Sequence, residues 1–183
     1  FQLENKTDAI VICGTTGEAS TLEDEEHLNV IRESVKYVDN RVPVIAGTGS
    51  NNTNHAIYMS KEAEKLGVDG LLLVTPYYNK ATQEGLKKHY SEIAKSVTIP
   101  ALMYNVPSRT GCNIEPLTTI EIVENNKNIV GIKEASGDSK QIKELRELSK
   151  LLKVKFDIYA GNDEEVLNVL KNGGSGVISV CSN

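Results

Sequence analysis

Seven short apolar runs, rich in β-branched residues, alternate with amphipathic stretches along the chain. Each run has the length and composition of a buried strand, and the seven span residues 9–13, 42–47, 70–75, 100–104, 129–133, 156–160 and 176–180. Between the runs, apolar residues recur at spacings of three and four, which places them on one face of a helix. These helical sets are Leu28, Ile31 and Val35; Ile57, Ala63 and Leu66; Leu86, Tyr90 and Ile93; and Ile142, Leu145 and Leu148.

Glycines and a serine mark the expected helix boundaries. Gly67 and the pair Gly173 and Gly174 are expected to stop helices, Ser139 to cap the start of one, and residues 1–7 resemble the tail of another. Successive strands begin about 20 to 33 residues apart, the size of one βα unit. Repeated βα units form either an open doubly wound sheet or a (β/α)₈ barrel.

The polar residues decide between these two architectures. Nearly every strand is followed by a polar segment, and the segments read GTTGEAS, GTGSNN, TPYYN, YNVPSRTG, KEASGD and GNDEE. Polar groups at the carboxyl ends of many strands indicate a barrel, because its βα loops converge on one axis, whereas an open sheet gathers them at one switch point. No strand is followed by GxGxxG or GxxxxGK[ST], the usual nucleotide-binding loops.

A complete barrel has eight strands, and the chain supplies seven. The missing strand is expected before Phe1, and the chain stops at Asn183, directly after its last strand. We therefore expect one α/β domain over residues 1–183, a (β/α)₈ barrel represented by strands two to eight and incomplete at both ends. An open barrel with an unpaired edge is expected to be poorly stable alone.

Composition fits an ordinary soluble globular domain: 183 residues, 39% of them hydrophobic and 25% charged. The net charge of −5 argues against nucleic acid or an anionic membrane as a partner. No apolar run reaches the length of a membrane span, and no signal peptide is visible, so a cytoplasmic location is expected.

The sequence predicts neither a disulfide framework nor a metal site. The cysteines are far apart and are expected to be free, buried thiols of a reducing compartment: Cys13, Cys112 and Cys181. The histidines fall on separate helical segments without a carboxylate or cysteine at ligand spacing: His27, His55 and His89.

The run at residues 129–133 ends in an unusual residue, Lys133. A lysine in a buried strand is costly unless it is used, and burial lowers the pKa of an amine. An unprotonated lysine forms Schiff bases with carbonyl substrates. The alternative is a strand-end lysine whose ammonium reaches water.

Two other strand ends carry groups suited to a small acid. Thr15 and Thr16 offer hydroxyls and backbone N–H groups to a carboxylate, although GTTGE could be a plain turn with Ser20 or Thr21 as N-cap. Arg109 follows a strand-end tyrosine by five residues and can grip a carboxylate with two hydrogen bonds. These features also occur as ordinary packing and surface residues.

Together these groups suit a Schiff-base aldolase acting on a 2-oxo acid. A lysine nucleophile, hydroxyl groups able to relay protons, and donors for carboxylates are what that chemistry needs. Because no metal ligands are predicted, the lysine serves as the electron sink.

Six ordered motifs resemble one enzyme family: GTTGE, VIAGTGSN, VTPYYN, LMYNVPSRTG, GIKEASGD and GVISV. They resemble the 4-hydroxy-tetrahydrodipicolinate synthases (dihydrodipicolinate synthases), of the pyruvate-dependent lysine–Schiff-base aldolase superfamily that includes N-acetylneuraminate lyase. The resemblance covers essentially all 183 residues. It implies condensation of pyruvate with L-aspartate 4-semialdehyde, a step of lysine and diaminopimelate biosynthesis, without a cofactor beyond the covalent imine.

The resemblance also implies a role for individual residues. Lys133 would form the imine with pyruvate, Tyr104 would be the general acid/base, and Thr16 would link Tyr104 to Tyr78 of a neighbouring subunit. The other implied substrate-binding residues are Thr15 and Thr16 for the pyruvate carboxylate, Arg109 for the semialdehyde carboxylate, and Gly161 and Ile178 through backbone groups. Sharing Tyr78 implies a homodimer, and the family usually pairs dimers into tetramers.

Two other functions stay open. One is a sugar-acid lyase of the same superfamily, although those enzymes usually lack the RTG that contains Arg109. The other is an inactive barrel fragment kept for an interaction, an alternative that the truncated ends leave open.

A possible allosteric cleft departs from the family pattern. Gly49, Asn51 and Tyr77 match the cleft in which feedback-inhibited members bind lysine, but His55 replaces a glutamate and Asp24 stands where some members have histidine. A histidine offers no fixed negative charge to the α-ammonium of lysine. We expect lysine to inhibit weakly or not at all, which steady-state assays with added lysine can check.

Overall fold

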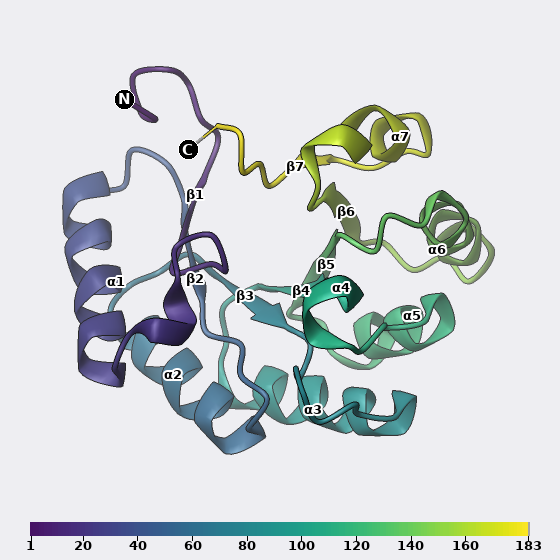
Figure 1. The fold of residues 1–183 in the computed structure, drawn as a ribbon, viewed down its shortest axis with the longest axis horizontal. Coiled ribbons are helices and arrows are strands. Elements are labelled where there is room, and N and C mark those ends of the chain that lie inside the picture. Colours follow the sequence, from purple (N-terminus) through teal and green to yellow (C-terminus); the bar gives the residue numbers. More distant parts are fainter. Residues whose placement is uncertain (183) are drawn as a thin grey trace.

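The computed structural model describes residues 1–182, in which seven parallel strands form one curled sheet (Figure 1). The strands are β1 (Ile10–Ile12), β2 (Val44–Gly47), β3 (Gly70–Val74), β4 (Ala101–Asn105), β5 (Ile129–Glu134), β6 (Asp157–Ala160) and β7 (Gly176–Val177). All seven predicted strands are present, with bounds shifted by a few residues, and β7 is the shortest. Their apolar, β-branched composition suits a sheet that is covered on both faces.

Helices follow the strands and lie in an arc outside them (Figure 1). The longer ones are α1 (Asp24–Val38), α2 (Thr53–Lys65), α3 (Gln83–Ser96), α5 (Pro116–Asn125), α6 (Ser139–Leu151) and α7 (Val166–Lys171). Three single turns sit in the loops, namely α4 (Pro107–Thr110) and the 3₁₀ turns η1 (Ala19–Thr21) and η2 (Asp163–Glu165). The four helices expected from periodicity are among them, and α7 precedes the expected stop at Gly173, whereas α4 and α5 were not anticipated.

The strand order identifies the architecture. Neighbours in the sheet are neighbours in the chain, from β1 to β7, and every pair is parallel. A doubly wound sheet would reverse its direction at a switch point, so the order confirms a partial (β/α)₈ barrel. The two ends of the chain approach one another at the open side of the arc, where the Gln2 side-chain amide donates a hydrogen bond to the Ser182 carbonyl (Figure 1).

Helix boundaries show which local signals were correct. Gly67 and Gly173 follow helix ends with φ of 86° and 82°, values in the left-handed region that glycine adopts freely, as predicted. Ser139 is not the N-cap of α6: the cap is Asp138, whose carboxylate accepts the N–H groups of Lys140 and Gln141. A carboxylate at this position also meets the positive end of the helix dipole.

Two expectations near the start of the chain were wrong. Residues 1–7 form turns rather than the tail of a helix. Ser20 and Thr21 lie inside η1, and the extended residue before α1 is Glu23.

The apolar residues form two clusters on opposite faces of the sheet. The larger cluster fills the space between strands and helices. The smaller one lies inside the barrel and contains Leu72, Leu102, Tyr104, Val106 and Ala135. A barrel interior of this kind is a packed core whose carboxyl end carries the functional groups.

The structure also bears on the cysteine, metal and membrane expectations. Cys13 and Cys112 are buried free thiols, but Cys181 is exposed, contrary to prediction, because it lies in the segment after β7. Within residues 1–182 no group of three or more His, Cys, Asp or Glu side chains could hold a metal ion. None of the helices in the same range is both long and apolar enough to cross a bilayer.

Candidate active site

Lys133 and Tyr104 form the centre of the candidate site. They are register partners on the adjacent parallel strands β5 and β4, so their side chains leave the sheet on the same face. The Lys133 Nζ lies 4.4 Å from the centroid of the Tyr104 ring. Only 7% of Lys133 and 6% of Tyr104 is exposed, so the alternative of a lysine reaching open water is wrong.

Burial lowers the pKa of Lys133 to about 8, because a low-dielectric environment disfavours the charged ammonium. The Asp163 carboxylate opposes this shift, and the Arg109 guanidinium adds to it. By the ordinary titration relation, about a tenth of such an amine is unprotonated at pH 7, against well under a hundredth for an unperturbed lysine. Lys133 is therefore equipped to act as a nucleophile.

The pKa of the Tyr104 phenol is raised, mainly by burial, while Arg109 and Thr15 act in the opposite direction. Of the two threonines in the turn, Thr15 is the one that acts on the pKa of this phenol, whereas the expected link runs through Thr16. The role of Thr16 stays a prediction.

The GTTGE segment is a tight turn at the carboxyl end of β1. The N–H of Gly17 donates to the Gly14 carbonyl at 3.0 Å, and the N–H of Glu18 donates to the Thr15 carbonyl at 3.1 Å. These two amides are used within the turn, so carboxylate binding would depend on the hydroxyls and amides of Thr15 and Thr16. Both threonines are exposed.

Gly161 and Ile178, which directly follow β6 and β7, lie on the same side of the sheet as Lys133 and Tyr104. A Cβ added at Gly161 would lie 3.2 Å from the Cε of Lys133 and 2.7 Å from the Ala135 Cβ, so glycine leaves space at the lysine. The Ile178 N–H donates to the Ala160 carbonyl at 2.9 Å, and its side chain packs against the interior cluster that contains Tyr104.

Arg109 and Tyr78 extend from neighbouring loops. Arg109 lies on α4, where it is exposed yet close enough to act electrostatically on both Lys133 and Tyr104. Tyr78 is 89% exposed and has a φ of 72°, which is uncommon for a bulky residue. Its backbone N–H donates to the Thr110 carbonyl at 3.2 Å, so the loop after β3 is tied to α4 while the Tyr78 ring faces outward.

The residues of the possible allosteric cleft form two separate groups of contacts. The Asn51 side-chain amide donates to the Tyr77 carbonyl at 3.2 Å, and Gly49 packs closely on the backbone of β3. His55, at the start of α2, pairs with Asp24 of α1 through a 2.9 Å contact between Nε2 and Oδ1. The two departures from the family pattern therefore contact each other.

Sequence reasoning missed two kinds of residue. Asp163 in the GNDEE segment acts on Lys133, and its carboxylate accepts hydrogen bonds from Ser179 and from the Val180 and Cys181 N–H groups. The position of Asp163 shortly after a strand was the feature of the sequence that could have identified it. The second kind, Asn105 and Glu134, directly follows Tyr104 and Lys133 and carried no signal beyond being polar in a buried strand.

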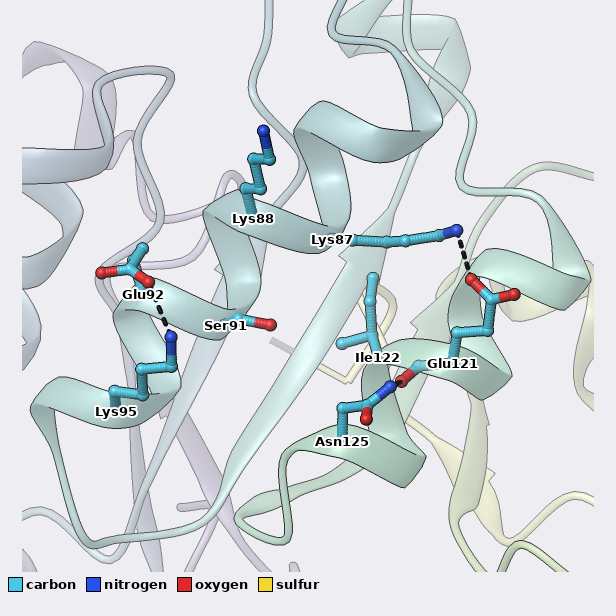
Figure 2. A pocket seen from close by; sticks show the side chains of 8 residues that line it. All are labelled: Lys87, Lys88, Ser91, Glu92, Lys95, Glu121, Ile122 and Asn125. Carbon is cyan, nitrogen blue, oxygen red and sulfur yellow. Dashed lines mark hydrogen bonds and ion pairs between the residues drawn. The ribbon is translucent and has the colours of Figure 1, made fainter.

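A shallow hollow of about 270 Å³ lies outside the barrel between α3 and α5 (Figure 2). Figure 2 shows Lys87 of α3 reaching Glu121 of α5, and Lys95 pairing with Glu92 on its own helix. Lys87 also pairs with Glu84 at 2.6 Å. The hollow is therefore a groove between two helices that an ion pair connects. None of the predicted site residues lines it.

Comparison with known proteins identifies the family of the chain. The model of the dihydrodipicolinate synthetase family matches residues 1–183. The chain belongs to this family. It is 56% identical, over all of its residues, to the 4-hydroxy-tetrahydrodipicolinate synthase of Lachnoclostridium phytofermentans, and it spans 61% of that relative's length.

Solved structures of the dihydrodipicolinate synthetase family share the fold. The chloride-inhibited enzyme of Acinetobacter baumannii, complexed with pyruvate, matches with a TM-score of 0.93 at 48% identity, over 99% of this chain and 61% of that one. The enzyme of Cyanidioschyzon merolae, with lysine bound, matches with a TM-score of 0.92 at 42% identity, over 98% of this chain and 60% of that one.

Proposed function

We propose that the protein containing this chain condenses pyruvate with L-aspartate 4-semialdehyde to give 4-hydroxy-tetrahydrodipicolinate. The observation that carries the proposal is the buried Lys133, whose Nζ lies 4.4 Å from the centroid of the Tyr104 ring and whose pKa is about 8. The names of the relatives support the same reaction.

The first step is imine formation. The unprotonated Lys133 amine attacks the C2 carbonyl of pyruvate, and the carbinolamine loses water to leave a C=N bond. Loss of a proton from C3 then gives an enamine. Tyr104 would donate and accept these protons, with the Thr15 side chain acting on the pKa of its phenol.

The second step joins the two substrates. The enamine carbon attacks the aldehyde of aspartate semialdehyde, forming a C–C bond and regenerating the imine. The amino group of the semialdehyde then attacks the imine carbon, closes the ring and releases Lys133 as a free amine. No cofactor takes part, because the iminium itself is the electron sink.

Carboxylate recognition is assigned to two groups. Thr15 and Thr16 would hold the carboxylate of pyruvate through hydroxyls and backbone amides. Arg109 would bind the carboxylate of the semialdehyde in a bidentate pair and is already close to the reacting groups.

The proposal includes a second copy of the chain. Tyr78 is too exposed to be a core residue, and we assign it to the active site of a partner subunit, which makes the protein a homodimer or a dimer of dimers. A cytoplasmic location and weak inhibition by lysine stay predictions. The Asp24–His55 pair supports the second, since it gives His55 a carboxylate partner of its own.

Borohydride reduction after incubation with pyruvate tests the mechanism. Reduction converts the imine to a stable amine adduct, which peptide mass spectrometry should locate on Lys133. A Lys133→Arg variant should give none, because a guanidinium does not form the imine. Lys127→Arg, which alters a lysine just before β5, is the matched control and should label like the wild type.

The remaining functions predict other outcomes. A folded protein that forms no adduct would contradict the synthase proposal and favour an inactive barrel fragment. An adduct accompanied by pyruvate release from N-acetylneuraminate or 2-keto-3-deoxygluconate, without consumption of aspartate semialdehyde, would instead indicate a sugar-acid lyase.

A further inference from the structure

Behind the reacting pair, a buried polar network occupies the opposite face of the sheet. Asn105 and Glu134 directly follow Tyr104 and Lys133, and they too are register partners. Because successive side chains of a strand alternate between faces, Tyr104 and Lys133 face the barrel interior while Asn105 and Glu134 face the helices. Neither Asn105 nor Glu134 is more than 2% exposed.

The Glu134 carboxylate is the hub of this network. The Asn105 Nδ2 lies 3.1 Å from both of its oxygens, the Gln141 Nε2 lies 3.1 Å from Oε2, and the Ser136 N–H donates to Oε1 at 2.8 Å. These contacts join β5 to β4, to α6 and to the loop that follows β5.

The network continues into the loop after α4, the helix that carries Arg109. The Asn105 Nδ2 donates to the Asn113 Oδ1 at 2.8 Å, and the Ile114 N–H donates to the Asn105 Oδ1 at 3.1 Å. The Asn113 Nδ2 in turn donates to the Gln141 Oε1 at 2.8 Å. The strands that carry Tyr104 and Lys133 are therefore connected, through buried and half-buried amides, to the loop that follows the Arg109 helix.

A buried carboxylate is an expensive way to obtain stability alone. Removing it from water costs free energy that its hydrogen bonds largely offset, and apolar residues of similar size often stabilise equally well. Directional hydrogen bonds do what apolar contacts cannot, because they fix the distance and angle between the groups that they join.

We propose that the Asn105–Glu134–Gln141–Asn113 network is a positioning device that holds the carboxyl ends of β4 and β5 in register and so keeps the Lys133 amine over the Tyr104 ring. It touches neither substrate, and it acts through residues one position away on each strand. The inference rests on the proposed function, since it concerns the geometry needed for imine formation.

Glu134→Gln tests the role with little change in shape. The new amide places an N–H donor where Asn105, Gln141 and the Ser136 N–H already donate, so at least one bond is lost. We expect the rate of pyruvate trapping by cyanoborohydride to fall roughly tenfold to a hundredfold, as for other small misplacements of reacting groups. The pH at half-maximal rate should rise, because a loosened Lys133 is less buried.

Two controls separate positioning from folding. Glu147→Gln alters an exposed carboxylate of α6 and should leave the trapping rate and its pH profile unchanged. A merely structural role would lower the fraction of protein that forms the adduct at long times while leaving its rate constant and pH midpoint alone. Gln141→Met removes one donor to Glu134 at similar side-chain length, and it should slow trapping about threefold with a shift of the same sign.

Each possible result of these experiments either supports or overturns the positioning role of the network. If Glu134→Gln traps pyruvate at the wild-type rate and pH midpoint, the inference is wrong while the proposed function stands. If that variant does not fold, Gln141→Met decides alone, and an unchanged rate and midpoint there would overturn the inference. A wild-type protein that forms no adduct would overturn the proposed function and the inference with it.

Discussion

Lys133 owes its chemistry to what surrounds it rather than to its own structure. Burial depresses its pKa, the Arg109 guanidinium depresses it further, and the Asp163 carboxylate raises it. The balance of these effects decides how much of the amine is free near neutral pH. Each of the two charges sits on a different loop, so each can be altered separately.

Asp163→Asn should shift imine formation to lower pH. Without its negative charge the ammonium of Lys133 is less stabilised, so the Lys133 pKa falls and the free amine appears earlier as pH rises. Because Asp163 is only partly buried, solvent screens its field, and we expect a gain of roughly twofold in trapping rate at pH 7. The measurement is the pH profile of pyruvate trapping.

Glu164→Gln is the matched control, since it removes an exposed carboxylate one position further on. Its pH profile should match the wild type. A midpoint that stays in place in Asp163→Asn, or moves to higher pH, would contradict the electrostatic role of Asp163.

At the scale of single residues, the sequence predicted which residue types serve the site better than it predicted where their side chains point. Lys133 stood out because a charged residue interrupted an apolar strand. The choice between Thr15 and Thr16 could not be made from the sequence, because it depends on how a tight turn rotates neighbouring side chains. The Asp138 cap was missed in favour of Ser139, although both residue types cap helices.

At the scale of elements, the end of β2 lies very close to the chain that follows β1, at Gly47. A Cβ added at Gly47 would lie 2.1 Å from the Cys13 carbonyl oxygen, a backbone atom that cannot turn away. The close approach lets the end of β2 lie against the start of the GTTGE turn.

Gly47→Ala should therefore destabilise the fold by roughly 3 kcal/mol, at the upper end of the usual cost of overpacking. The free energy of unfolding in urea is the measurement. Gly176→Ala is the control, because its Cβ would lie 3.7 Å from the Tyr159 ring, an ordinary contact distance. Equal stability of the two variants would show that the strands can separate without cost.

Elements with a strong period were predictable, and short ones were not. The seven strands are continuous apolar runs, and the helices α1, α2, α3 and α6 contain enough apolar residues to show the spacing of three and four. A single turn such as α4 has no period, and it forms because Pro107 suits its first position and Gly111 adopts the left-handed conformation at its end.

On the scale of the whole molecule, Tyr78 is a predicted site residue whose exposure a single chain leaves unexplained. If it completes the site of a partner, two defective variants should rescue each other. In a mixed dimer of Lys133→Arg with Tyr78→Ala, one site combines an intact Lys133 with an intact Tyr78. Random assortment of equal amounts should then restore about a quarter of the wild-type condensation rate.

Mixing Lys133→Arg with Arg109→Ala separates this arrangement from general stabilisation. Arg109 acts on Lys133 of its own chain, so neither site of this mixed dimer is intact, and activity should not recover. Lys133→Arg mixed with a double variant that lacks both Lys133 and Tyr78 should recover nothing. If Lys133→Arg and Tyr78→Ala gain no activity after refolding together, Tyr78 serves its own chain.

The sequential order of the strands also has a consequence for biosynthesis. Since β1 to β7 pair in the order in which they leave the ribosome, each new βα unit can dock on the sheet already formed. Between β1 and β7 no strand waits for a distant partner, which limits the time that apolar edges stay unprotected. Tyr104 and Lys133 thus meet before Asp163 has been added, and of its two charged neighbours Lys133 acquires the carboxylate last.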